Sequence, residues 1–259
     1  MLIGFLLAIV VGATLGLVGS GGTILTVPIL VYVMGVDPVL ATTYSLFAIG
    51  MTSLIGAVRG FRAKEVDIHK ILSFGLPSLV MVFITRAFIV PLIPKVIVIA
   101  GYAIEQSVLL MVLFAMVMLA SSWSMITEAE RKLDANCVIP LWQIVVQGLF
   151  VGLVTGAVGA GGGFLIIPAL VSFYHMPVKK AVSTSLVIIA VNSLFGLVGD
   201  WGRFEKFDWP LILGYTGFAM CGIFLGFALS KKMNGQHLKK MFGYVILLMG
   251  LYVIYKELG

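Results

Sequence analysis

The sequence predicts an all-α integral membrane protein built from two inverted-topology repeats of about five membrane segments each. Composition gives the first reason, because 61% of the 259 residues are hydrophobic and 11% are charged, whereas a soluble domain carries about 25% charged residues. The apolar runs give the second reason, because they reach the ~18 residues of a spanning helix and lack the alternation of a barrel strand. The third reason is an internal duplication.

The duplication is visible when the sequence is shifted by 140 residues. Residues 16–30 then fall on residues 156–170, with four glycines and one proline in register. Between 16–65 and 156–205 the halves share 18 identities in 50 positions without a gap. We therefore divide the chain into a first repeat, a cytoplasmic connecting loop and a second repeat, at residues 1–126, 127–140 and 141–259.

Each repeat is expected to open with a helical hairpin broken by glycine. The run from Leu2 to Val18 is long enough for a membrane helix, and Gly19-Ser20-Gly21-Gly22 interrupts it because glycine is a poor helix former. A short helix, Thr23–Met34, then reaches a turn before Pro38, which suits the first turn of a helix. The rest of this half is expected as a span at Val39–Val58, a solvated loop at 59–70, a span at Ile71–Val90 kinked at Pro77, a turn and interfacial segment at Pro91–Gln106, and a span at Ser107–Ile126.

The second half is expected to repeat this plan. Its hairpin consists of a helix at Leu141–Val158, a break at Gly159–Gly163, and a short helix at Phe164–Tyr174 that ends in the turn His175-Met176-Pro177. The later segments are expected as spans at Val178–Val198, Pro210–Leu229 and Met241–Tyr255, with a loop at 199–208 and a basic loop at Lys231–Lys240.

The distribution of lysine and arginine chooses between two topologies. If each broken segment crosses the membrane once, the basic residues divide 9 against 8. If each segment is a hairpin that enters and returns, one side collects 12, at 59, 62, 64, 70, 131, 132, 179, 180, 231, 232, 239 and 240, and the other collects 5, at 86, 95, 203, 206 and 256. Cytoplasmic loops are enriched in basic residues. We therefore expect inverted repeats in the inner (cytoplasmic) membrane, with both termini outside the cytoplasm.

The two glycine breaks predict a binding site. Inverted repeats place such breaks on opposite approaches to one pocket near the membrane midplane, and irregular backbone at that depth is tolerated where it lines a cavity. The short helices that follow Gly22 and Gly162 would offer unpaired N–H groups and a positive dipole end to an anion. Neither break contains Lys or Arg. The sequence therefore predicts a small anion held by backbone amides and hydroxyls.

The candidate binding residues come from the breaks and from the polar positions of the spans that follow them. They are Gly19, Ser20, Gly21, Gly22, Thr23, Thr43 and Ser45 in the first half, and Gly159, Gly161, Gly162, Gly163, Thr184, Ser185 and Asn192 in the second. Two other interpretations stay open, because glycines also allow close helix packing and hydroxyls in helices also bond their own backbone. We expect alanine at Gly22 or Gly162 to leave folding intact and to weaken anion binding.

Charged and metal-binding residue types contribute less to the predicted site. Arg86 is expected to snorkel from near a helix end. Three carboxylates that flank turns are expected to be solvated, and a turn histidine is expected to be structural; these are Asp37, Glu105, Asp200 and His175. Cys137 and Cys221 have no metal-binding or disulfide pattern. We therefore expect no metal and no cofactor.

The glycine pattern carries a family resemblance. Gly16-x-x-Gly19-x-Gly21-Gly22-x5-Pro28-x-Leu30 recurs as Gly156-x-x-Gly159-x-Gly161-Gly162-x5-Pro168-x-Leu170, each followed by a span bearing Ala and Ser. This pattern resembles the sulfite exporter TauE/SafE family, and the likeness covers essentially the whole chain. It implies transport of small sulfur-containing anions such as sulfite, sulfonates or sulfoacetate. Because Ser20 and Thr23 correspond to Ala160 and Gly163, the pocket is not expected to be symmetric.

We therefore expect a secondary transporter, an exporter of a small sulfur-containing anion that works by alternating access. An anion channel and a transporter of another small anion are the alternatives. A membrane enzyme is disfavoured, because the spans offer no convergent acids, nucleophile or metal ligands in recognisable spacing. The expected partners are the anionic substrate and the lipid bilayer, without nucleic acid; a homo-oligomer stays open.

Overall fold

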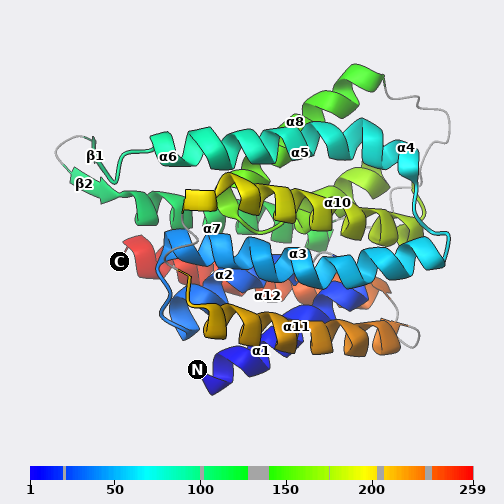
Figure 1. The fold of residues 1–259 in the computed structure, drawn as a ribbon, viewed down its shortest axis with the longest axis horizontal. Helices are drawn as coiled ribbons and strands as arrows, with labels where there is room; N and C mark the ends of the chain where they lie inside the picture. The colour runs from blue at the N-terminus through cyan, green and yellow to red at the C-terminus, as the bar shows by residue number, and fades with distance from the viewer. Residues whose placement is uncertain are drawn as a thin grey trace.

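The computed structural model describes residues 1–258 apart from 20–21, 100–101, 128–139, 175, 203–206 and 231–234, and it forms a bundle of helices (Figure 1). Ser20, Gly21, His175 and nearly all of the connecting loop lie outside the described residues. The first half contains α1 (Leu2–Val18), α2 (Thr23–Pro28), the π-helical η1 (Ile29–Val33), α3 (Pro38–Arg62), α4 (Ile68–Lys70), η2 (Ile71–Gly75), α5 (Leu76–Ile84), η3 (Thr85–Ile89), α6 (Val90–Leu92), β1 (Val96–Ile99), β2 (Tyr102–Glu105) and α7 (Gln106–Thr127). The second contains α8 (Leu141–Val158), α9 (Gly163–Pro168), η4 (Ala169–Phe173), α10 (Val178–Gly199), α11 (Trp209–Ser230) and α12 (Gly235–Leu258).

Six helices of the described chain are long and apolar enough to cross a membrane, which confirms the predicted class of protein. They are Pro38–Arg62, Ile68–Leu92, Gln106–Thr127, Leu141–Val158, Lys179–Gly199 and Trp209–Ser230. Two shorter apolar helices, Leu2–Val18 and Thr23–Val33, form the first glycine-broken pair. The chain is thus a multi-pass membrane protein.

Several boundaries differ from the sequence-based expectation. The segment after Pro91 contains an antiparallel hairpin of β1 and β2, in which Val96 pairs with Glu105, because β1 is a run of β-branched residues that favours a strand. Arg59 and Arg62 belong to α3 rather than to a loop, and α12 begins at Gly235 inside the expected basic loop.

Asp37 caps α3 by accepting hydrogen bonds from Val39 N and Leu40 N at 3.0 and 3.1 Å.

The broken helices of each half fold back as hairpins. In the first half, Gly4 at the start of α1 lies against Met34, directly after η1. In the second half, Gly148 in the first half of α8 lies against the carbonyl of Phe74, and the ring of Phe74 packs edge-on against Tyr174, directly after η4. Each hairpin therefore returns to the end of the bundle where it began, as expected.

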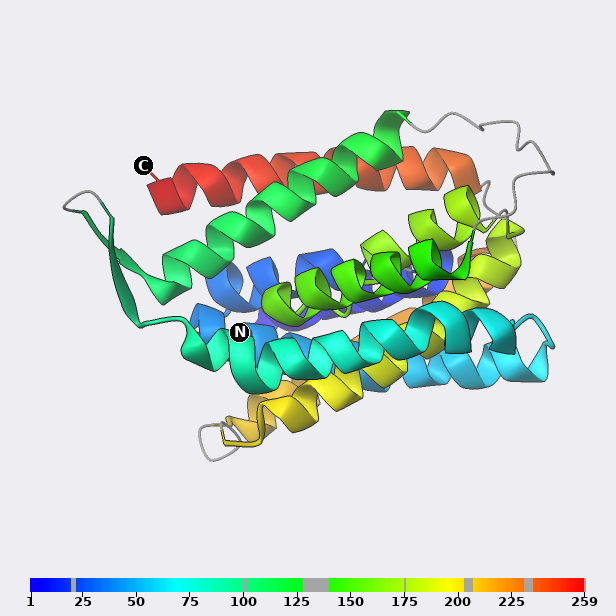
Figure 2. The same cartoon turned by 90° about the horizontal axis from the view of Figure 1, so that it is seen from above.

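The long helices pair across the two halves. The closest pairs are α1 with α11, α8 with α5, α3 with α10, and α7 with α12 (Figure 2). The contacts between α3 and α10 are reciprocal, since Gly56 packs on Leu186 and Gly196 packs on Leu46. Residue numbers rise along α3 as they fall along α10, so these two central helices are antiparallel.

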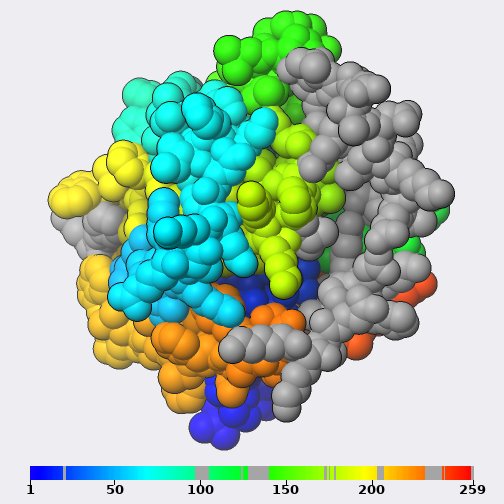
Figure 3. Space-filling view, turned by 90° about the vertical axis from the view of Figure 1, so that its right-hand side faces the viewer, coloured from blue at the N-terminus to red at the C-terminus, as the bar shows by residue number. Residues whose placement is uncertain are grey.

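The two ends of the bundle differ in charge. Figure 1 shows the end of α3 and the start of α10 at the right-hand end of the bundle. The described residues in and beside these two helix ends and α4 include six basic ones: Arg59, Arg62, Lys64, Lys70, Lys179 and Lys180. Figure 3 looks onto this end, where the α3–α4 turn lies beside the start of α10, and Asp67 N donates to Thr184 Oγ1 at 3.0 Å. Both chain termini lie at the opposite end (Figures 1 and 2).

Candidate functional site

Both glycine breaks begin with the same backbone turn. Gly19 caps α1 with φ 76°, and Gly159 caps α8 with φ 73°. Each glycine N–H donates to the carbonyl four residues earlier, Leu15 O and Thr155 O, at 2.8 Å. Glycine adopts this left-handed conformation without steric cost and ends helices in this way. The expected helix breaks are therefore confirmed at both positions.

The breaks diverge after this turn. Gly161 and Gly162 are left-handed, with φ 66° and 71°, whereas Gly22 is right-handed with φ −69°. Ser20 and Gly21 lie outside the described residues, and both short helices then begin with a buried residue, Thr23 or Gly163. The conformations of the two breaks are thus different, although their glycines are in register.

Each short helix begins in tight contact with the first arm of its own hairpin. A Cβ added at Gly22 would collide with the carbonyl oxygen of Val11 and the hydroxyl of Thr14. A Cβ added at Gly162 would collide with the side chain of Thr155. These glycines are therefore needed for close packing, which is the first of the two other interpretations of the sequence.

Each break also faces the other half of the chain. Gly19 packs against Val182 of α10 and Ile167 of α9, and Gly159 packs against Thr42 of α3. Val182 is the residue 140 positions after Thr42, so the two breaks face equivalent positions. The short helices α2 and α9 also contact each other, which brings both breaks to the interface of the halves.

The break of the second half has a buried ion pair beside it. Arg86 of η3 and Asp200, directly after α10, lie 2.9 Å apart (Nη1 to Oδ2), and both side chains are about 1% exposed. Arg86 Nη1 also donates to Thr42 Oγ1 at 3.0 Å, and Thr43 Oγ1 donates to Asp200 Oδ2 at 2.8 Å. A Cβ at Gly159 would collide with Arg86 Nη2. The guanidinium therefore lies directly against the glycine backbone.

The expectations for these two charged residues were wrong. Arg86 does not snorkel and Asp200 is not solvated, because small residues let the surrounding helices close over them. Gly156 packs against Thr85, and a Cβ at Gly199 would lie 2.9 Å from Arg86 Cβ. The helix also passes through the π-helical segment η3 at Arg86, a geometry that often marks functional sites. No feature of the sequence indicated that Arg86 meets a carboxylate 114 residues away.

The predicted hydroxyl residues do not gather in one pocket. Thr43 contacts the ion pair, and Ser45 is buried two residues further along α3, with no hydrogen-bond partner for its Oγ among the described residues. Thr184 lies at the opposite end of the bundle, where it accepts from Asp67 N. Ser185 Oγ donates to its own helix at Val182 O, 2.8 Å away. Thr43 is thus the predicted hydroxyl closest to the charged pair.

A second polar zone surrounds Gly161 and Gly162. A Cβ at Gly161 would lie 2.9 Å from Ser193 Oγ and 2.7 Å from Ile49, which is near the middle of α3. Asn192, which was predicted, is buried and donates from Nδ2 to Ser78 Oγ at 2.8 Å. Its Oδ1, Ser193 Oγ and Thr155 Oγ1 have no hydrogen-bond partner within the part of the chain that the structure describes.

Ser193, Thr155 and Arg86 are the residues of this region that sequence reasoning missed. One signal pointed to Ser193, because it is identical to Ser53 across the duplication. Buried polar groups without a protein partner are uncommon and call for an explanation such as a bound ion or water. The arrangement offers an arginine paired with Asp200, hydroxyl donors and a glycine backbone, which together can donate hydrogen bonds to an anion. The described residues contain no group of His, Cys, Asp or Glu that could hold a metal.

Comparison with known proteins gives one family over nearly the whole length. The family model described as sulfite exporter TauE/SafE matches residues 4–253. Similar curated proteins are each called a "probable membrane transporter protein". They include proteins of Xylella fastidiosa (26% identical, covering 95% of this chain and 92% of the relative), Methanocaldococcus jannaschii (26%, 96% and 94%) and Bacillus subtilis (26%, 97% and 98%). No solved structure matches the chain significantly.

Proposed function

Because the chain belongs to the sulfite exporter TauE/SafE family of membrane transporters, we propose that it is a secondary transporter that exports a small sulfur-containing anion, of the sulfite, sulfonate or sulfoacetate class. The observation that carries the proposal is the fully buried Arg86 lying against Gly159. A buried cation beside glycine backbone and hydroxyls can bind an oxyanion by charge-assisted hydrogen bonds. The chemistry is shared by other small anions, and these are the alternative substrates.

The proposed site is centred on the break of the second half. Arg86 and Thr42 border it at Gly159, and Ser193 and Thr155 border it at Gly161 and Gly162. The unpartnered hydroxyls of Ser193 and Thr155 support this assignment, because an anion would accept their hydrogen bonds. Around this centre we retain the two glycine clusters, Thr23, Thr43, Ser45, Ser185 and Asn192 as candidates, and give Thr184 less weight because it bonds to a distant loop.

The two breaks are proposed to serve one pathway unequally. The residue 140 positions after Arg86 is Gly226, which packs against Gly16 of α1. The positive charge of Arg86 therefore has no counterpart at the equivalent position of the other repeat. Such asymmetry supports one anion site that is reached alternately from either side of the membrane, rather than two equivalent sites.

We infer that the repeats are inverted. The two-fold axis that would exchange Gly56 with Gly196 and Leu46 with Leu186 must run perpendicular to the antiparallel helices α3 and α10. If these helices cross the membrane, the axis lies in the membrane plane, as in many secondary transporters. Alternating access would then follow from rocking of one half against the other.

The basic end of the bundle is proposed to face the cytoplasm, with both termini outside, in the inner membrane. We predict that single cysteines at Lys64 and Lys180 react with an impermeant maleimide from the cytoplasmic side only, and that a cysteine at Lys95 reacts from the outside only. The background lacks Cys137 and Cys221. Labelling of positions 64 and 95 from the same side of the membrane would contradict the proposed topology.

The function is tested in liposomes that contain the purified protein. We predict saturable uptake of radiolabelled sulfite, with counterflow when unlabelled sulfite is preloaded, because a carrier exchanges its substrate through one site. Liposomes without protein are the control. Uptake of none of sulfite, taurine or sulfoacetate would remove the substrate assignment, and flux that does not saturate and shows no counterflow would favour an anion channel.

A further inference from the structure

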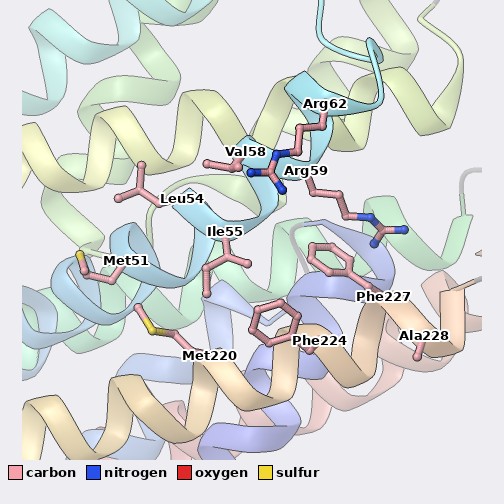
Figure 4. Close-up of a pocket in the computed structure, with 10 residues that line it drawn as sticks. All are labelled: Met51, Leu54, Ile55, Val58, Arg59, Arg62, Met220, Phe224, Phe227 and Ala228. Carbon is pink, nitrogen blue, oxygen red and sulfur yellow. The ribbon is translucent and has the colours of Figure 1, made fainter.

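A second site is suggested by a groove on the outside of the bundle, none of whose lining residues belongs to either glycine break. The groove encloses about 780 Å³ between α3 and α11 (Figure 4). Its walls are apolar, with Leu54 and Val58 on one side and Phe224 on the other; these side chains are 37%, 51% and 59% exposed. Both helices are candidate membrane spans, so the groove opens towards lipid.

One end of the groove is strongly basic. Figure 4 shows Arg59 and Arg62 at the end where α3 terminates, with Met51 and Met220 at the other end. The guanidinium of Arg59 lies 4.0 Å above the ring of Phe227. Within the described ranges, neither arginine forms an ion pair with a carboxylate. Two positive charges thus meet an apolar surface without a compensating acid.

The duplication shows that the apolar wall of the groove is repeated but the two arginines are not. The wall residues Leu54 and Val58 are repeated as Leu194 and Val198 in α10. The two arginines are replaced at the corresponding positions by Gly199 and Gly202. The apolar wall is therefore common to both halves, whereas the basic end is specific to the first.

We propose that this groove binds an acidic phospholipid. An acyl chain lies along Leu54, Val58 and Phe224, and the headgroup phosphate is held by Arg59 and Arg62. Arginine forks bind phosphate oxygens in pairs, and basic pockets between membrane helices are known to hold anionic headgroups. The volume lies within the range of ligand sites. A free anion would use the arginines but gain nothing from the apolar walls, so the groove as a whole fits a lipid. The proposal does not depend on which substrate is transported.

Native mass spectrometry of the purified protein, titrated with phosphatidylglycerol and with phosphatidylcholine, tests the proposal. We expect phosphatidylglycerol to bind more tightly to the wild type, and the variant Arg59→Gln/Arg62→Gln to lose about 30-fold in affinity for it, since each arginine near an anionic surface contributes about a factor of five. The matched control is Lys179→Gln/Lys180→Gln, which removes the same charge at the same end of the bundle but outside the groove. It should bind phosphatidylglycerol as the wild type does.

A second variant separates a lipid from a soluble anion. Val58→Trp fills the groove and keeps both arginines, so we expect it to lose phosphatidylglycerol as well, while its melting temperature reports that it is folded. Equal loss in the Lys179 and Lys180 control would overturn the proposal, because the attraction would then be general. The proposal would also be overturned if Val58→Trp bound phosphatidylglycerol as tightly as the wild type and inorganic phosphate displaced the lipid. A third outcome would assign the groove to a second copy of the chain. In that outcome the wild type is a dimer without preference for phosphatidylglycerol, and the Val58→Trp variant is a monomer.

Discussion

Replacing Arg86 with methionine is expected to destabilise the folded protein by about 3 kcal/mol or more. The side chain is fully buried and its partner Asp200 is buried 2.9 Å away. Removing one member of a buried ion pair leaves the other charge without its compensation, which typically costs about 3–5 kcal/mol. Unfolding of the detergent-purified variant, followed by intrinsic fluorescence against denaturant, measures the change. The control is Lys95→Met, directly before β1, where the side chain is exposed, and it should change stability little.

The double variant Arg86→Met/Asp200→Asn should recover most of this loss. Exchanging a buried ion pair for hydrophobic residues of similar volume is often neutral or stabilising. Asparagine at position 200 also removes the charge, and it can still accept the hydrogen bond from Thr43. A double variant no more stable than Arg86→Met would mean that the cost does not come from the broken pair, and that the packing of the arginine side chain is what matters.

Gly22→Ala is expected to reduce the yield of folded protein, contrary to the expectation from sequence alone. The added Cβ collides with the carbonyl oxygen of Val11. A backbone carbonyl cannot relieve the collision by changing rotamer, as a side chain can. Overpacking of this kind costs about 1–3 kcal/mol and sometimes more. Size-exclusion profiles of the detergent-solubilised variant give the folded fraction. A monodisperse Gly22→Ala protein of wild-type stability would show that α2 can shift away from α1 freely.

Gly162→Ala provides the matched comparison, because its collision is with the side chain of Thr155. We expect the double variant Gly162→Ala/Thr155→Ala to be more stable than Gly162→Ala, since the hydroxyl and methyl that block the new Cβ are gone. It should not reach wild-type stability, because φ 71° at Gly162 still costs alanine about 1 kcal/mol. Lack of any rescue by Thr155→Ala would contradict the predicted collision.

The glycine breaks and the hairpins could be predicted from sequence because their causes are local. Gly19 and Gly159 each end a helix through a left-handed turn. Because the two halves repeat with a shift of 140 residues, the position of one break predicts the position of the other. The hairpin arrangement was predictable from chain length, since 33 residues at ~1.5 Å per residue exceed the ~30 Å of hydrocarbon.

The charged centre of the site was not predictable in the same way. Its burial depends on four helical segments that meet only in the fold, η3, α3, α8 and α10, where Gly199 and Gly159 allow close approach to Arg86. Nothing near Arg86 in the sequence distinguishes it from an arginine that extends to the membrane surface. The same holds for Thr184, whose hydroxyl bonds to the backbone at Asp67, 117 residues away. A predicted site built from equivalent positions of the two repeats therefore included Thr184 and its neighbour Ser185, which lie towards the other end of the bundle.

The central claim is that Arg86 beside Gly159 binds the transported anion, and sulfite binding to the double variant Arg86→Met/Asp200→Asn tests it most directly. This protein is expected to fold, so a loss of binding cannot be attributed to unfolding. A ligand that binds the folded state raises the melting temperature, and above Kd the increase grows with the logarithm of the ligand concentration. The account predicts that sulfite stabilises the wild type in this way and does not stabilise the double variant. Equal stabilisation of both proteins by sulfite would contradict it, and would place the anion away from Arg86.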